Sequence, residues 1–281
     1  MPLRTRILEL VDTPIRQAGF ADDRWYPSDP ATLEQTIDQY LAIPASPQNA
    51  LGLVAPHAGY FYSGGVAGAV YGSVTVPDRV VVIGPNHRGV GARRSVMTHG
   101  TWQIPGHNIP IDSAFAQKFL ELAPNFSNDP HAHSMEHSLE LQLPFLRRRN
   151  PRMKLVPICL WPQQLNDCER IGLALAKTIQ EHSEPTLIVA SSDMNHFESA
   201  QIGNAKDQMA IQEIIALNPH RLFDTVRQND ISMCGMVPTT IMLFATLALG
   251  AVQASLVKYA DSGDASGDKN SVVGYAGLSV S

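Results

Sequence analysis

The chain has 281 residues, of which 44% are hydrophobic and 17% are charged, and its formal net charge is −5. This composition is typical of a water-soluble globular protein and excludes a disordered or fibrous chain. The small acidic excess disfavours a nucleic-acid partner or an anionic membrane partner, since both need surplus Lys and Arg.

The N-terminus and the cysteines indicate where the protein works. Residues 1–16 mix charged with apolar side chains, unlike the uninterrupted apolar stretch of a signal peptide. The longest weakly polar run, residues 241–252, is shorter than the roughly 20 residues that cross a bilayer. Cys159, Cys168 and Cys234 form no CxxC pair and are too few for a disulfide framework. We therefore expect a cytoplasmic protein.

Short apolar runs alternate with segments of helical periodicity along the chain. The first helix is expected to begin at Asp29-Pro30, where proline suits the first turn. The next expected elements are strand 51–55, helix 66–71, strand 79–84, a hairpin of 95–99 and 101–104, and helices 113–122 and 136–149. Further on are expected strand 154–160, helix 165–181, strand 186–191, helices 205–216, 219–227 and 237–249, and strands 255–259 and 272–276.

This alternation predicts an α/β fold, namely a layered sandwich with a mostly parallel or mixed central sheet flanked by helices. No repeat or linker divides the chain, so a single domain is expected over residues 1–281. In such folds the functional residues lie beyond the carboxyl ends of the strands.

A histidine follows three of the predicted strands. His57 comes after strand 51–55, and His87 and His196 follow the strands that end at residues 84 and 191. A loop histidine bonded to the backbone is the common alternative for any one of them. Three at one edge of a sheet instead favour a metal site or an acid–base site.

Cys234 lies in a loop that leads into helix 237–249. The dipole and the free N–H groups of a helix N-terminus favour a thiolate there, so Cys234 is a candidate functional residue. Cys159 and Cys168 fall within a predicted strand and helix, and both are interpreted as small buried hydrophobes.

Glu136, His137 and Glu140 open the predicted helix 136–149. Acidic side chains in a first turn commonly cap the helix or offset its dipole, and Glu136 and Glu140 are interpreted in this way. His137 has no such structural role and remains a candidate for the site.

Several separated motifs resemble, in order, those of the MEMO family, which includes bacterial component B of the AmmeMemoRadiSam system. They are AGF at 18–20, WYP at 25–27, APHAGY at 55–60, GPNH at 84–87, EHSLELQLPFL at 136–146, SSDMNH at 191–196 and CG at 234–235. The resemblance covers nearly the whole chain. It implies other AmmeMemoRadiSam system proteins as partners.

The family resembles class III extradiol dioxygenases, in which two histidines and a glutamate hold a non-haem iron. Carried over by position, His57 and His87 are the histidine ligands, Cys234 stands where the glutamate stands, and His196 is the acid–base histidine. A sulfur ligand makes the site softer, so it suits Cu or Zn as well as the Fe(II) that the resemblance favours.

The resemblance thus implies a non-haem metal-dependent oxidoreductase in which His196 moves a proton and Asp193 or His137 supports it. The sequence has no Ser-His-Asp nucleophile elbow and no phosphate-binding glycine loop, which disfavours hydrolysis. Two alternatives remain open. One is a non-catalytic adaptor that binds a peptide or small molecule in the same cleft, and the other is an iron- or copper-handling protein.

Overall fold

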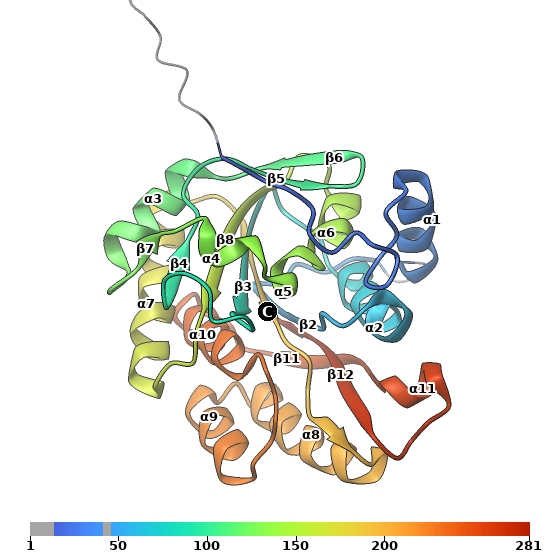
Figure 1. The fold of residues 1–281 in the computed structure, drawn as a ribbon. Helices are drawn as coiled ribbons and strands as arrows, with labels where there is room; N and C mark the ends of the chain where they lie inside the picture. Colours follow the sequence, from blue (N-terminus) through green and yellow to red (C-terminus); the bar gives the residue numbers. More distant parts are fainter. Residues whose placement is uncertain (1–13, 42–45) are drawn as a thin grey trace, which may run out of the picture.

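The computed structural model describes residues 14–41 and 46–281. Its main element is a mixed sheet in the order β10-β12-β2-β9-β3-β8-β4-β7, with β11 paired to β12. Helices flank this sheet (Figure 1), as the sequence predicted for an α/β sandwich. Residues 1–13, on which most of the signal-peptide prediction depends, lie outside the described residues.

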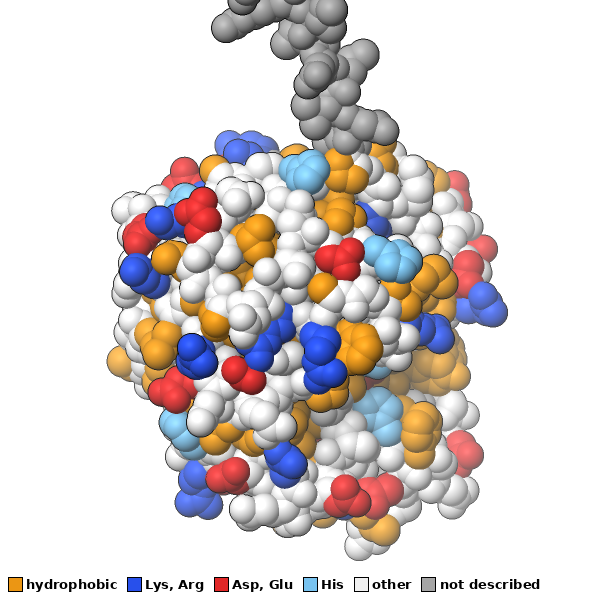
Figure 2. Space-filling view, turned by 60° about the vertical axis from the view of Figure 1, so that its left-hand side comes forward, with side chains coloured by type: hydrophobic (Ala, Val, Ile, Leu, Met, Phe, Trp, Pro, Cys, Tyr) orange, Lys and Arg blue, Asp and Glu red, His pale blue; other side chains and the backbone are white. Residues whose placement is uncertain are grey.

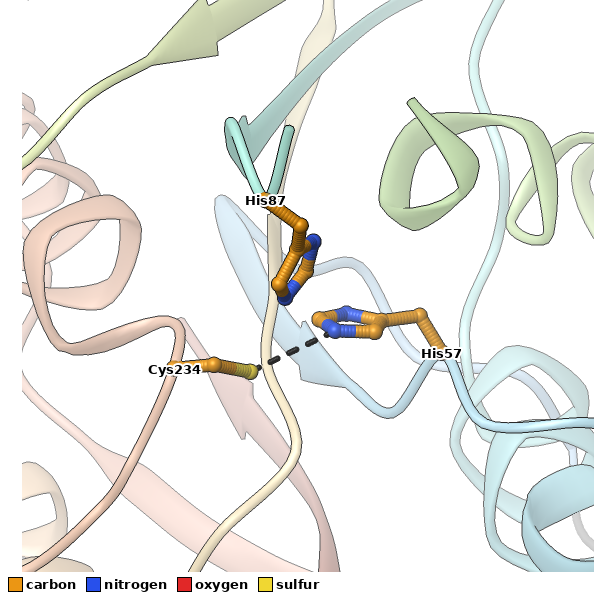
Figure 3. Close-up of side chains that lie close together, drawn as sticks. All are labelled: His57, His87 and Cys234. Atoms are coloured by element: carbon orange, nitrogen blue, oxygen red, sulfur yellow. Dashed lines mark hydrogen bonds between the residues drawn. The ribbon is translucent and has the colours of Figure 1, made fainter. Parts of the chain in front are cut away.

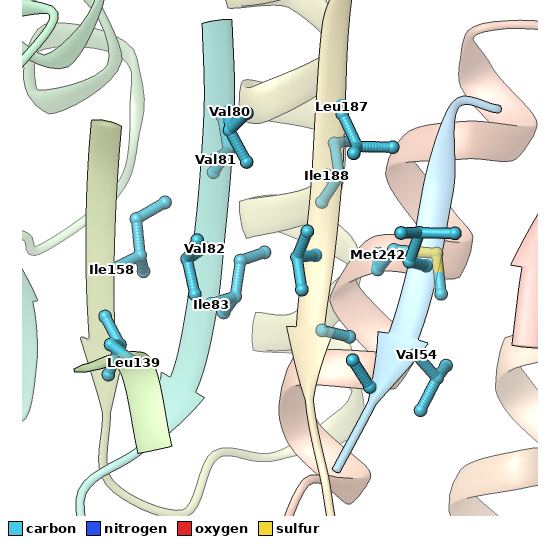
Figure 4. Packing of buried hydrophobic residues seen from close by; sticks show 14 of the residues in the cluster. Val54, Val80, Val81, Val82, Ile83, Leu139, Ile158, Leu187, Ile188 and Met242 are labelled. Atoms are coloured by element: carbon cyan, nitrogen blue, oxygen red, sulfur yellow. The ribbon is translucent and has the colours of Figure 1, made fainter. Parts of the chain in front are cut away.

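Four parallel strands form the centre of the sheet. They are β2 (Gly52–Ala55), β9 (Thr186–Ser191), β3 (Arg79–Pro85) and β8 (Lys154–Leu160). Every residue of β9 is buried, and branched side chains of adjacent strands, such as the paired Val81 and Ile188, belong to one hydrophobic cluster (Figure 4). Strands covered on both faces need continuous apolar runs, which is why the sequence predicted all four.

Antiparallel strands complete both sides of the sheet. On one side, β12 (Val272–Val280) pairs with β2, β11 (Ala254–Asp261) and β10 (His196–Glu198). On the other, β4 (Arg94–Val96) pairs antiparallel with β8 and parallel with β7 (Ser127–Asn128). The sheet is therefore mixed, with its parallel part in the middle.

The predicted hairpin of residues 95–99 and 101–104 is wrong. β4 joins the main sheet, whereas β5 (Thr101–Ile104) pairs with β6 (His107–Pro110) and with β1 (Ile15–Arg16) in a separate small sheet. The chain reverses at Gly106, whose φ of +78° is easily adopted only by glycine, so the hairpin forms one strand later than expected.

The longer helices follow the predicted periodicity closely. They are α1 (Pro30–Leu41), α2 (Tyr60–Ser73), α3 (Ser113–Leu122), α7 (Leu165–His182), α8 (Ala200–Ile215), α9 (Pro219–Gln228) and α10 (Met236–Ala248). α2 begins six residues before its predicted start. The glycines of α2 interrupt the helical spacing of apolar residues on which the prediction was based. They are there because the helix packs closely: a Cβ at Gly68 would lie 2.4 Å from Tyr40 O.

The predicted helix 136–149 is two short helices, α5 (His137–Glu140) and α6 (Leu143–Arg149). Pro144 lies at the start of α6 and has no N–H to donate to the carbonyl of Glu140, so one continuous helix is disfavoured. Two further short helices, α4 (His131–Ser134) and α11 (Ser262–Ser266), complete the described fold. Within residues 14–41 and 46–281, no helix is both long enough and apolar enough to cross a membrane.

Candidate metal centre

Three neighbouring parallel strands deliver the candidate residues to one edge of the sheet. β2, β9 and β3 are adjacent and parallel, and they end shortly before His57, Asp193 and His87 respectively. Cys234 approaches the same edge from the loop before α10 (Figure 3). One ligand atom each from His57, His87 and Cys234 lies within 4.8 Å of the other two. The Sγ of Cys234 is 3.3 Å from the Nε2 of His57.

The tautomer of His57 follows from its hydrogen bonds. Its Nδ1 is 2.8 Å from the Oγ of Ser191. That hydroxyl has one proton, which it donates to the carbonyl of Ser138 at 2.7 Å. It must therefore accept from Nδ1–H of His57, which leaves the lone pair of Nε2 facing Cys234. A serine that the sequence did not single out thus leaves Nε2 of His57 free to accept an ion or a proton.

Glu136 orients His87 in a similar way. Its carboxylate accepts the backbone N–H of His87 at 2.6 Å and lies 2.9 Å from Nδ1 of the same residue. Burial raises the pKa of Glu136, but the hydrogen bond and charge of His87 outweigh it and lower the pKa to about 2. An ionised carboxylate only accepts, so Nδ1 of His87 is the donor and Nε2 is its other nitrogen. Glu136 also accepts Ser138 N–H at the start of α5, so the capping prediction is confirmed but incomplete.

Burial keeps two histidines of the site uncharged. Desolvation, with the charge of His87, lowers the pKa of His57 to about 3. Desolvation, with the charge of His57, lowers the pKa of His137 to about 3 as well. A neutral imidazole is the form that binds metals, so near neutral pH no proton competes for these rings.

Cys234 differs from its sequence prediction. The helix N-terminus was expected to favour a thiolate, but burial, followed by the charge of Asp193, raises the pKa of Cys234 above its usual range. The backbone N–H of Asp193 donates to its Sγ at 3.3 Å. The next residue, Gly235, packs directly on the end of β9, where a Cβ would lie 2.2 Å from the Cβ of Ser192. This close contact holds the sulfur beside the strand ends.

His196 lies outside the group of three. Its backbone N–H donates to Ser232 Oγ at 2.8 Å, and its Nδ1 is 2.9 Å from the carbonyl of Ser232. Since a carbonyl only accepts, Nδ1 carries a proton, and in the neutral ring the lone pair is on Nε2. The carboxylate of Asp193 instead accepts the backbone N–H of His57 at 2.8 Å. Ser232 thus orients His196, a role that the sequence analysis assigned to Asp193 or His137.

His137 lies in an aromatic stack beside the site. Its ring is stacked on His87 with centroids 4.6 Å apart, and Trp25 is 4.6 Å from it on a tilted plane. The ring of His57 is 5.3 Å away and edge-on. His137 therefore lies beside the site, although it is not one of the group of three formed by His57, His87 and Cys234.

Glu140 lies in the first turn of α5, as its predicted role requires, and it also anchors the N-terminal segment. Its buried carboxylate pairs with Arg16 and accepts the backbone N–H groups of Gly19 and Phe20. The hydroxyl of Tyr26 also donates to it, at 2.6 Å. These contacts join residues 114 to 124 positions apart and fix the segment that places Trp25 against His137.

The site is open to solvent on one side. The side chain of His87 is 29% exposed, whereas that of His57 is 2% exposed. The surface is hollowed at mid-height on the face in Figure 2, with a histidine side chain at the edge of the hollow. Exposed aromatic side chains follow the site residues in sequence: Phe61, Tyr62 and Phe197.

Comparison with known proteins gives consistent matches along the chain. The family model described as Memo-like protein matches residues 16–279. A MEMO1 family protein from Methanosarcina mazei is 39% identical over 268 residues, which cover 95% of this chain and 99% of that protein. One from Pyrobaculum aerophilum is 39% identical over 241 residues, covering 85% and 86%. An uncharacterized Escherichia coli protein of known structure has a TM-score of 0.54 at 15% identity, covering 81% of this chain and 98% of that chain, which is a likeness of fold alone.

Proposed function

This chain belongs to the Memo-like protein family, and on that premise we propose that it is a metal-dependent redox protein whose non-haem ion is held by His57, His87 and Cys234. The observation that carries the proposal is the convergence of a sulfur and two oriented imidazoles within 4.8 Å at the strand ends.

The observed spacing suits a shared ion. A tetrahedral ion bound at about 2.3 Å to sulfur and about 2.0 Å to nitrogen separates these two ligands by about 3.5 Å. The Sγ of Cys234 and the Nε2 of His57 are 3.3 Å apart, so binding requires little movement. We favour Fe(II) as the occupant because of the resemblance to extradiol dioxygenases. Thiolate and imidazole also suit Cu and Zn.

A bound ion supplies a Lewis-acidic, redox-active centre. The chain supplies the groups around it. Ser191 and Glu136 fix the ligand rings of His57 and His87 through their Nδ1 atoms. The Nε2 lone pair of His196 serves as the general base, since Ser232 holds the proton on Nδ1.

The second candidate function is non-catalytic capture of a peptide or small molecule. The exposed aromatic side chains Phe61, Tyr62 and Phe197 favour it, because aromatic residues are common contacts in binding surfaces. This function predicts that ligands bind equally well whether or not metal is present.

The first experiment measures metal content by elemental analysis, on protein purified without a metal-affinity column. Anaerobic reconstitution with Fe(II), Cu(I) or Zn²⁺ follows, with oxygen consumption measured on catechols and thiols. We expect one ion at this site and oxygen uptake with a redox-active metal. The Cys159→Ser variant, which alters a buried cysteine outside the site, is the matched control for Cys234→Ser. Failure to bind any of the three metals contradicts the proposal, and so does oxygen uptake that persists unchanged in Cys234→Ser.

A further inference from the structure

We propose that the chain has a second metal site, formed by His87, Glu136 and His137, with His87 between the two ions. It rests on the proposed function only in sharing His87 with the first site. Its own ligands are a carboxylate and two imidazoles. That set is harder than one with sulfur and suits a divalent ion such as Zn²⁺.

The three ligand atoms already have the spacing of a metal site. The Oε1 of Glu136 lies 2.9 Å from Nδ1 of His87 and 3.4 Å from Nδ1 of His137. One ligand atom from each residue lies within 4.8 Å of the others. An ion bound at about 2.0–2.2 Å to nitrogen and carboxylate oxygen separates its ligands by about 3.0–3.5 Å. The two distances from Glu136 therefore fit an ion with shifts of a few tenths of an ångström, and the rings of His87 and His137 must turn to bring both nitrogens to it.

His137 supplies the second line of evidence. Its Nδ1 is buried and forms no hydrogen bond with any part of the chain that the structure describes. Such an atom is uncommon in a folded protein and calls for an explanation such as an ion. The ring is stacked on His87 and lies against Trp25 on a tilted plane, and these contacts restrict its movement. The side chain is 12% exposed, which leaves a path from solvent.

The orientation of His87 allows it to serve both sites. One ring nitrogen points toward His57 and Cys234, and the other points away from them (Figure 3). The latter is Nδ1, which donates to Glu136. A divalent ion at the second site takes the place of the Nδ1 proton, and the proton leaves to solvent. The imidazole ring then bridges the two ions through its two nitrogens.

The test titrates the metal-free, full-length chain with Co²⁺. Elemental analysis after gel filtration gives the number of ions per chain, and thiolate-to-cobalt charge-transfer absorption reports the first site alone. We expect two ions in the unmodified chain. His137→Phe, which keeps an aromatic ring in the stack, is expected to retain one ion together with the charge-transfer absorption. Cys234→Ser is expected to lose that absorption and to keep the second ion.

Two further variants complete the design. His131→Phe makes the same change at an exposed histidine six positions away and is expected to retain both ions. Glu136→Gln removes the carboxylate and is measured alongside His137→Phe, with circular dichroism confirming that each variant folds. Loss of the second ion in both variants but not in His131→Phe supports the proposal.

The outcomes separate this site from the first one. A single ion that shows the charge-transfer absorption and is unaffected by His137→Phe overturns the second site and leaves the first intact. A single ion without that absorption, lost in His137→Phe, supports the second site and contradicts the first. Two ions retained in His137→Phe also overturn the proposal.

Discussion

Replacing Ser191 with alanine tests whether the tautomer of His57 is set by this hydroxyl. The Oγ of Ser191 accepts from Nδ1 of His57 at 2.8 Å and from the amide of Gln142 at 2.8 Å, and it donates to the carbonyl of Ser138 at 2.7 Å. In Ser191→Ala the amide of Gln142 keeps the carbonyl of Pro56 at 3.0 Å. Nδ1–H of His57 loses the Oγ of Ser191 as its acceptor, and the ring stays buried.

The magnitude follows from these contacts. Leaving a buried donor unsatisfied costs about 1–3 kcal/mol, and each ordinary hydrogen bond contributes about 0.5–1.5 kcal/mol. The expected loss in free energy of unfolding is therefore about 2–4 kcal/mol, a large part of the roughly 5–15 kcal/mol typical of a domain. Losing the partner that orients a ligand histidine typically weakens metal binding about 10–100-fold.

The assay combines urea unfolding of the metal-free protein with a Co²⁺ titration followed by charge-transfer absorption. Ser63→Ala is the matched control, because Ser63 is also buried but donates to the carbonyl of Ala58 and not to a histidine. We expect the control to lose about 1 kcal/mol and to bind metal normally. If Ser191→Ala binds cobalt as tightly as the control does, the tautomer argument is refuted.

Four other variants test three separate parts of the structure. His196→Ala should keep its metal but lose oxygen uptake, because His196 is not a ligand in our proposal; loss of metal would make it one. Gly274→Ala places a Cβ 1.9 Å from Asp207 Oδ2 and should lower the free energy of unfolding in urea by about 1–3 kcal/mol. Gly203→Ala, inside α8, meets only ordinary contacts with Val272 and Asn195 and should raise it by about 0.5–1 kcal/mol. Burial lowers the pKa of His133 to about 3, so the unfolded chain binds more protons below pH 6.5 and stability falls as the pH drops from there toward 3. Between pH 7 and 5 the free energy of unfolding should fall by about 2 kcal/mol because of His133. Urea unfolding of His133→Asn should show a smaller fall over this range, and an unchanged pH dependence would contradict the lowered pKa of His133.

The strand ends could be predicted because buried parallel strands have a direct signature in sequence. The predicted strand 186–191 has the same bounds as β9, so Asp193 lies just beyond its carboxyl end, at the edge of the sheet. The position of Cys234 followed from the helix after it. Its closeness to His57, 177 residues away, came from the family resemblance.

The partners that orient the proposed ligands could not be predicted from sequence patterns. Ser191 reads as the end of an apolar strand, and nothing local shows that its hydroxyl meets a ring 134 residues away. Glu140 has an ordinary capping interpretation, but its partner Arg16 is 124 residues away. Long-range pairing of single polar side chains leaves no periodicity to detect.

Burial changes the pKa values of His57 and Cys234, and these determine which of the two must lose a proton when a metal binds. Nε2 of His57 already has a free lone pair, because Ser191 holds the proton on Nδ1 and desolvation keeps the ring neutral. Cys234 is the opposite case, since burial raises its pKa and keeps the thiol protonated near neutral pH. Binding at the first site must therefore remove the thiol proton, and the affinity rises with pH through this residue and not through His57. The thiol of Cys234 thus makes occupancy of the site depend on an ion that binds strongly enough to displace that proton.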